Sequence, residues 1–279
     1  MSAVLDAPSV EQWSGKDRGD ENFPVGVLIR PALRHHVHAF YAFARNADDI
    51  ADSPVLSADD KVARLDVMEA ALTEGAPGSP SGARLRASLA ETGTSARHAV
   101  ELLVAFRRDA TKRRYATWDE LIDYCRYSAM PVGRHVLDLH GERPETWEPS
   151  DALCTALQVL NHMQDCAQDL AALDRCYVPE DMLAAHGASV EDVRLVSETS
   201  GLRATFAEML DRVDALNETA RSLPRATRDL RLRLETAVIV GLSHRLARRL
   251  RRGDPLAGRV RLHKSDAVAS MLASLRSLA

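Results

Sequence analysis

The chain has 279 residues, of which 46% are hydrophobic and 27% are charged, and its formal net charge is −4. This composition can bury a full core and indicates a globular protein, and it offers no overall positive field that would favour nucleic acid as a partner. No apolar run approaches the ~20 residues that a membrane-spanning helix needs.

Helical periodicity dominates the chain after a short polar start. Residues 1–21 are polar and irregular, and we predict a flexible N-terminal arm there, followed by one domain at 22–279. Beyond Pro24, apolar residues recur at three- and four-residue spacing, and the alternation typical of strands is nearly absent. We therefore predict an all-α fold, built as one compact bundle. The predicted helices cover residues 31–52, 58–73, 81–92, 95–115, 118–140, 150–172, 198–221, 226–252 and 264–278.

Pro131 interrupts the predicted helix at 118–140, and Ser128, Ala129 and Gly133 surround it. A proline inside a helix removes a backbone hydrogen bond, and small neighbours allow another element to come close. We therefore predict a kink here and a close approach of a second helix.

The four cysteines are predicted to be reduced core thiols. They lie in apolar helical patterns without a C-x-x-C spacing, which argues against disulfides and against a zinc site. No basic stretch followed by an apolar one opens the sequence, so no signal peptide is visible. These features predict a cytoplasmic protein. The cysteines are Cys125, Cys154, Cys166 and Cys176.

Three pairs of aspartates have the spacing D-x-x-x-D. Chance alone gives about two such pairs at this aspartate content, so only their context can assign a role. They are Asp48 with Asp52, Asp119 with Asp123, and Asp165 with Asp169.

Context separates the middle pair from the other two. Thr117 is placed to cap a helix, and Asp119 lies in the first turn, where the helix dipole favours an anion, so we interpret this pair as structural. Asp48 and Asp52 instead end a helix, where the dipole disfavours anions, and the third pair lies deep in an apolar helix.

Projection at helical steps places each remaining pair on an oxygen-rich stripe. Carboxylate and amide oxygens are ligands that Mg²⁺ prefers, so two such stripes that face each other would form a magnesium site. Solvated surfaces, with a local ion pair from Arg45 to Asp49 or Asp52, are the open alternative. The first stripe holds Tyr41, Arg45, Asp48 and Asp52, and the second Asn161, Asp165 and Asp169, with Gln158 and Gln168 beside it.

Four ordered stretches resemble motifs of the squalene and phytoene synthase family, and the likeness spans about residues 22–265. The resemblance implies an all-α bundle of the isoprenoid synthase type with a central cavity. It also implies a prenyl diphosphate substrate, bound through Mg²⁺ that two aspartate-rich helices hold. The stretches are FYAFARNADDIAD at 40–52, YCRYSAMPVG at 124–133, QVLNHMQDCAQD at 158–169 and RCYVPEDML at 175–183.

The resemblance also implies a role for individual residues. Tyr124 and Tyr127 are candidates to orient an attacking water or to stabilise a carbocation, and Arg45 would stabilise the departing diphosphate. The metal site would consist of Asp48, Asp52, Asn161, Asp165 and Asp169. The diphosphate contacts would come from Arg45, Asn161, Gln158 and Lys264, with Arg259 or Arg261 near the last of these.

Within the family, the stretches at 21–26, 123–141 and 153–166 most resemble the branch that converts presqualene diphosphate and water to hydroxysqualene in bacterial hopanoid pathways. Gln164 and Gln168 replace the Arg and Glu common in relatives that join two prenyl diphosphates, which favours an enzyme handling one diphosphate. A synthase that joins two farnesyl or geranylgeranyl diphosphates is the alternative.

The basic segment 225–264 holds 12 Arg or Lys against three acidic residues. The segment predicts either a solvated helix face or contact with an anionic substrate or membrane surface. A pyrophosphohydrolase would need glutamate-rich motifs, and a di-iron bundle would need E-x-x-H on two helices. The sequence contains neither pattern. A non-catalytic helical scaffold stays as an alternative.

Overall fold

A computed structural model describes residues 9–11 and 28–278, with side chains up to Leu275. These residues form helices joined by loops, and no strand occurs among them, which confirms the all-α prediction. The predicted arm at 1–21, apart from residues 9–11, and the stretch at 21–26 lie outside the described residues. Residues 9–11 contact the loop before the third helix, where Glu11 accepts hydrogen bonds from Ser79 and Ser81.

Twelve α-helices and three short 3₁₀ turns make up the described chain. The α-helices are α1 (Arg34–Ala51), α2 (Ala58–Thr73), α3 (Pro80–Thr92), α4 (Arg97–Thr111), α5 (Trp118–Ser128), α6 (Met130–Leu139), α7 (Trp147–Leu173), α8 (Glu180–Ala185), α9 (Ser200–Ala220), α10 (Leu223–Ala226), α11 (Leu230–Leu250) and α12 (Lys264–Leu278). The 3₁₀ turns are Pro31–Leu33, Pro144–Thr146 and Val190–Arg194.

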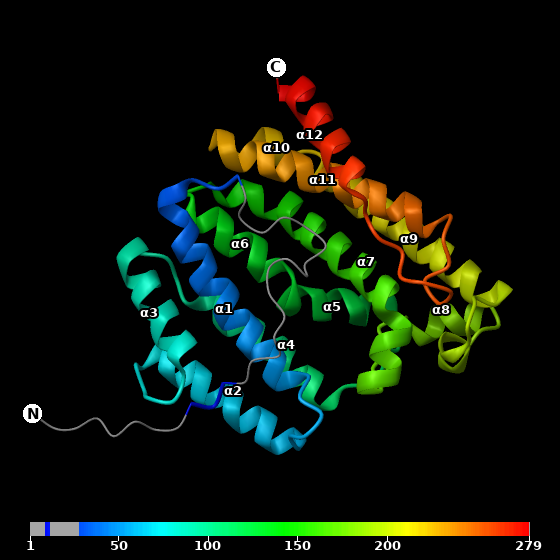
Figure 1. Cartoon of the computed structure of the whole chain (residues 1–279), viewed down its shortest axis with the longest axis horizontal. Coiled ribbons are helices and arrows are strands. Elements are labelled where there is room, and N and C mark those ends of the chain that lie inside the picture. The colour runs from blue at the N-terminus through cyan, green and yellow to red at the C-terminus, as the bar shows by residue number, and fades with distance from the viewer. Residues whose placement is uncertain (1–8, 12–27, 279) are drawn as a thin grey trace, which may run out of the picture.

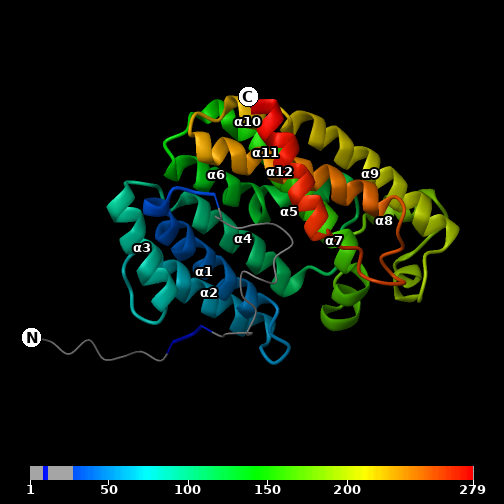
Figure 2. The ribbon, with the colours of Figure 1, turned by 45° about the horizontal axis from the view of Figure 1, so that its top comes forward.

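The helices are arranged around α7, the longest of them (Figures 1 and 2). Helices α1 to α4 lie on one side and pack their own apolar faces together, with Phe43 and Ile50 fully buried. Helices α9, α11 and α12 lie on the other side. Leu160 and Met163 of α7 belong to the largest apolar cluster, so α7 lies at the centre of the fold.

The break predicted at Pro131 is present and is stronger than a kink. Ala129 leaves the helical conformation and separates α5 from α6, with Pro131 in the first turn of α6. A Cβ on Gly133 would collide with the side chains of Ser150 and Cys154 on α7. The close approach of a second helix is therefore confirmed, and it requires a glycine on α6.

The predicted helix at 95–115 ends earlier, at Thr111, because the next residues take part in a different interaction. The chain at 113–116 runs beside the chain at 176–181, and backbone hydrogen bonds join Cys176 N to Arg113 O and Glu180 N to Tyr115 O, both at 2.9 Å. This contact fixes the segment that follows α7.

The predicted helix at 226–252 begins later, at Leu230, and ends at Leu250 as α11, while the short helix α10 precedes it. Asp229 lies between them in an extended conformation, and its side chain accepts hydrogen bonds from the backbone N–H groups of Arg231 and Leu232, both at 2.9 Å. An aspartate cap of this kind starts a new helix.

Two other predictions concern the cysteines and the bilayer. All four cysteines are free thiols, as expected. No helix in the described part of the chain is both long enough and apolar enough to cross a bilayer.

Candidate active site

The acidic stripe on α1 lies at the C-terminal end of that helix. Arg45 contacts Asp48 at 2.9 Å and Asp49 at 3.2 Å, so the local ion pair that the sequence left open is present. Asp52 caps the helix, and its side chain, like that of Asp48, stays partly exposed. Carboxylates thus remain accessible at this end of α1.

The pKa of Asp48 is raised to about 8. Loss of hydration among the surrounding helices is the main cause, the nearby Asp52 carboxylate adds to it, and Arg45 acts in the opposite direction. A site that disfavours negative charge in this way would gain from a cation placed between the two carboxylates.

The stripe on α7 continues from apolar to polar residues along one face. Leu153, Leu157, Asn161, Asp165 and Asp169 follow one another at four-residue steps, which keeps them on neighbouring turns of the same face. The three polar members are partly exposed, although most of the neighbouring helix is buried. One face of α7 therefore leads from an apolar end to an oxygen-rich end.

Asp165 is engaged by a cation from the loop between α11 and α12. Arg259 forms an ion pair with it: Nη2 donates to Oδ2 at 2.8 Å, and Nε lies 2.7 Å from Oδ1. The sequence named Arg259 as a possible phosphate contact, and the structure brings it to the acidic stripe instead of Lys264. Lys264 is exposed at the start of α12 and makes no ion pair within the described chain.

Arg175 connects the ends of α1 and α7. Its Nη1 donates to Asp52 Oδ1 at 3.0 Å, and its backbone N–H donates to the Asp169 carbonyl at 3.3 Å. The side chain is almost fully buried, and Nη2 donates to the backbone carbonyl of Asp109 at 3.0 Å. Through this residue the two acidic stripes belong to one structural unit.

Asp109 of α4 lies beneath Arg175 as the centre of a buried polar network. It accepts hydrogen bonds from Tyr124 at 2.7 Å and from Tyr177 at 3.1 Å. Burial raises the pKa of Asp109 to about 6, and Arg175 opposes the shift. Lys61 is buried nearby. Its pKa is lowered, mainly by burial and to a smaller extent by repulsion from Arg175.

An aromatic wall joins this network to α7. His162 stacks on Tyr177 with ring centroids 3.5 Å apart, and Tyr177 lies 5.3 Å from Tyr115 and 5.4 Å from Tyr124. Burial, together with the charge of Arg175, lowers the pKa of His162 to about 3, so the imidazole is neutral. Gln158 lies 3.0 Å from His162 through their Nε2 atoms.

The two tyrosines named from the sequence have different surroundings. Tyr124 is buried and bonded to Asp109, close to the junction of the stripes. Tyr127 is partly buried, and the guanidinium of Arg108 lies 4.5 Å from its ring centroid. The structure brings Tyr124 to the site and places Tyr127 against Arg108.

The middle aspartate pair behaves as predicted for a structural pair. Thr117 caps α5 by accepting from the Glu120 N–H at 3.2 Å, and Asp119 lies in the first turn. Asp123 pairs with Arg108 at 2.8 Å.

An apolar cavity of about 200 Å³ adjoins the apolar end of the α7 stripe. It lies among α1, α6, α7 and α11, and Leu153 and Leu157 contribute to its wall. The remaining lining residues are mostly aliphatic: Ile29, Val37, Val132, Gly133, Val136, Leu137, Ser150, Cys154, Leu223, Leu232, Glu235, Thr236 and Ile239.

Sequence analysis assigned no individual role to several residues that the structure places in the site. Arg175 and Tyr177 lie in the RCYVPEDML stretch, so that motif was a usable signal, but its spacing alone assigns them no partner. Asp109, Lys61 and His162 carry no local signal, because their proximity depends on the packing of α2, α4 and α7.

The fold is an all-helical bundle in which α7 carries an oxygen-rich stripe at one end and lines an apolar cavity near the other, and comparison with known proteins gives the family. The sequence profile described as squalene/phytoene synthase matches residues 16–266. The chain therefore belongs to the squalene/phytoene synthase family.

Similar proteins share most of their length with this chain. A hydroxysqualene synthase from Rhodopseudomonas palustris is 46% identical over 96% of this chain and 92% of its own. One from Sinorhizobium fredii is 44% identical over 87% and 84% of the two chains. The crystal structure of squalene synthase HpnC from Alicyclobacillus acidocaldarius superimposes with a TM-score of 0.73 at 36% identity, covering 82% of this chain and 86% of its own.

Proposed function

We propose that the chain ionises presqualene diphosphate with the help of Mg²⁺ and captures the carbocation with water, giving hydroxysqualene and diphosphate for hopanoid biosynthesis. The names of the relatives that are 43–46% identical support this reaction. The structural observation that carries it is the link from Asp52 through Arg175 to the end of α7, whose other end lines an apolar cavity.

The donor set of the site suits magnesium. The carboxylates and the amide are hard oxygen ligands on two helices, and a cation between Asp48 and Asp52 would relieve the repulsion between these two carboxylates. When bound, Mg²⁺ would neutralise the charge that develops on the departing diphosphate. The proposed ligands are Asp48, Asp52, Asn161, Asp165 and Asp169.

The cationic and amide side chains would bind the diphosphate and favour its departure. Arg45 already lies beside Asp48, and Arg259 is partly exposed, so either guanidinium can donate to phosphate oxygens without leaving the site. Gln158 and Lys264 are further candidates on α7 and α12. The bond from carbon to the diphosphate oxygen breaks, and its electron pair leaves with the diphosphate.

The apolar cavity would protect the cation from premature reaction with bulk water. Water then adds through its oxygen to the rearranged cation and loses one proton. Tyr124 is held by Asp109 in the wall of the site, so its ring or hydroxyl group is the better placed of the two tyrosines to act on the cation or the water. The ring of Tyr127 instead contacts the guanidinium of Arg108, which makes Tyr127 the weaker candidate.

The surroundings of Gln164 favour a single diphosphate. This residue is buried, and its amide donates to the Val260 carbonyl in the loop that carries Arg259. It therefore holds a loop and adds no charge for a second diphosphate. The alternative is condensation of two prenyl diphosphates. This chain is also 28% identical to a 15-cis-phytoene synthase from Paracoccus, which supports that alternative.

The proposal includes a cytoplasmic location with peripheral contact at the inner face of the membrane, since a C30 product is insoluble in water.

The purified chain with Mg²⁺ should convert presqualene diphosphate to hydroxysqualene and should not consume farnesyl diphosphate supplied alone. Chromatography with mass detection separates the products. Formation of presqualene diphosphate or phytoene would establish the alternative, and inactivity toward every prenyl diphosphate would overturn the proposal.

A further inference from the structure

Helix α12 exposes three large apolar side chains and buries two of its serines. Val268, Leu272 and Leu275 are 59%, 51% and 50% exposed, and they follow at the four- and three-residue steps of one helix face. Ser270 and Ser274 are only 2% and 5% exposed. This is the reverse of the usual arrangement on a surface helix, in which the apolar face packs inward.

Specific contacts with α11 fix this orientation. A Cβ on Gly241 would lie 3.1 Å from Ser270 Oγ, so the two helices approach closely at small residues. Arg245 Nε donates to Ser270 Oγ at 3.1 Å, and Arg249 binds Asp266 in the first turn of α12. The apolar face is therefore held outward by the rest of the fold.

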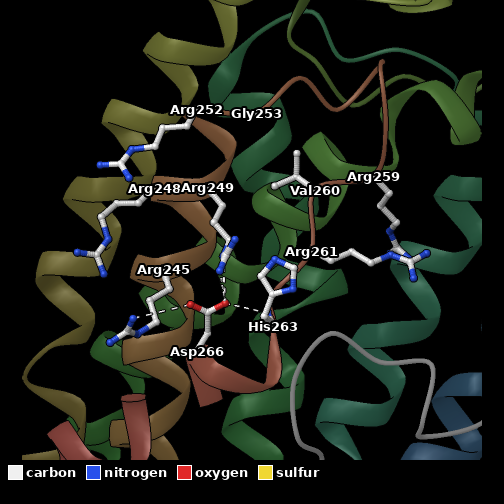
Figure 3. A pocket seen from close by; sticks show the side chains of 10 residues that line it. All are labelled: Arg245, Arg248, Arg249, Arg252, Gly253, Arg259, Val260, Arg261, His263 and Asp266. Carbon is white, nitrogen blue, oxygen red and sulfur yellow. Dashed lines mark hydrogen bonds and ion pairs between the residues drawn. The ribbon is translucent and has the colours of Figure 1, made fainter. Parts of the chain in front are cut away.

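A basic hollow of about 770 Å³ borders the start of α12 (Figure 3). Arg248 projects from α11, Arg252 from the turn directly after it, and Arg261 from the loop before α12. All three are exposed, and within the described chain none of them has a carboxylate partner. Unneutralised arginines thus lie beside an exposed apolar row.

We propose that this surface docks the protein on an anionic lipid bilayer, with Val268, Leu272 and Leu275 entering the interface and the arginines binding lipid phosphates. An apolar row next to cationic side chains is the combination that interfacial helices use. A symmetric contact with a second copy would bring like-charged hollows near each other, which disfavours that occupant. The inference rests on the peripheral membrane contact included in the proposed function and assigns that contact to a surface, but it depends neither on the metal site nor on the reaction.

Flotation of the full-length protein with lipid vesicles tests the docking surface. Binding to vesicles containing phosphatidylglycerol should exceed binding to pure phosphatidylcholine and should weaken as salt is raised from 50 to 500 mM. Replacement of Val268, Leu272 and Leu275 by serine should abolish it. Replacement of Arg248 and Arg252 by glutamine should lower the partition constant about 10-fold or more.

Matched variants elsewhere control for folding and for charge. Serine at Val55, Val196 and Leu230, which are also exposed, and glutamine at Arg84 and Arg225 should leave vesicle binding unchanged. Equal binding by the wild type and the α12 variants would overturn the proposal. It would also be overturned if the wild type did not bind vesicles and the α12 variants had lost self-association, because the surface would then join two copies of the chain. Because no substrate is present, this result is independent of the reaction. In detergent, where the substrate is dispersed, the serine variants of α12 should keep full turnover.

Discussion

Arg175 donates a hydrogen bond to Asp52 at 3.0 Å, although 123 positions separate the two residues. Its guanidinium also contacts the Tyr177 hydroxyl at 3.2 Å and the Asp109 carbonyl at 3.0 Å. One buried cation thus holds the end of α1 against the segment that follows α7. We infer that Arg175 is a positioning residue, since its contacts are with the proposed ligands and their supports.

Replacement of Arg175 by glutamine should destabilise the protein by about 3 kcal/mol, because it leaves the buried Asp109 carboxylate without its cation. The loss should be smaller at pH 5, where Asp109, with a pKa of about 6 that the change would raise further, takes up a proton. Urea unfolding at pH 5 and pH 8 measures both values. Arg221, an exposed residue paired with Glu218, is the control, and its glutamine variant should change stability by less than about 0.5 kcal/mol.

Replacement of Arg259 by glutamine should separate metal binding from substrate binding. Asp165 loses the cation that now neutralises it, so the Mg²⁺ concentration for half-maximal activity should fall several-fold. The KM for presqualene diphosphate should rise, because a phosphate contact is lost. Steady-state kinetics with Mg²⁺ and substrate varied independently measure both changes. If neither value moves, the Arg259 contact has no part in the site.

Replacement of Gly133 by alanine should destabilise the packing of α6 on α7 by about 2–3 kcal/mol, since the new methyl group collides with Ser150 and Cys154. A second change, Ser150 to alanine, removes the nearest atom and should restore part of the loss. Gly258, whose added Cβ would meet nothing within 4 Å, provides the control. Thermal unfolding of the three variants measures the effect, and an unaffected Gly133 variant would contradict the close approach.

His135 should make stability fall as the pH falls below about 6.5. Its ring is buried against Phe40, and burial lowers its pKa to about 3, so between these pH values the unfolded chain binds a proton that the folded chain does not. In the His135→Phe variant this dependence should be absent. The difference in unfolding free energy between wild type and variant should change by up to about 1.4 kcal/mol per pH unit from pH 4 to 6 and level off above pH 7. Identical pH profiles for both proteins would contradict this, because they would show that His135 takes up a proton as readily in the folded state as in the unfolded state.

The helices and the two stripes could be predicted from the sequence because helical periodicity is local. Asp165 and Asp169 share a face with Leu157 by spacing alone, and Pro131 marked the separation of α5 from α6. The early end of α4 could not be predicted, because residues 113–116 are held by backbone hydrogen bonds from a segment about 60 residues away.

Partners within the site were harder to predict for the same reason. Arg259 and Lys264 are both cationic and close in sequence, and only the path of the loop after α11 decides that Arg259 reaches Asp165. Likewise, the apolar residues of α12 indicate a helix but not its orientation. That orientation depends on Gly241 and Ser270 allowing α11 to pack on the polar side of α12.

In the proposed mechanism, Asp48 on α1 and Asp165 on α7 contribute to a single metal site. Titration of the protein with Mn²⁺, followed by electron paramagnetic resonance, tests it without substrate. We expect Asp48→Asn and Asp165→Asn each to lower the affinity for Mn²⁺ at least 10-fold, while Asp119→Asn, in the structural pair, leaves it unchanged. Wild-type Mn²⁺ affinity in the Asp48 and Asp165 variants would contradict a shared metal site on α1 and α7.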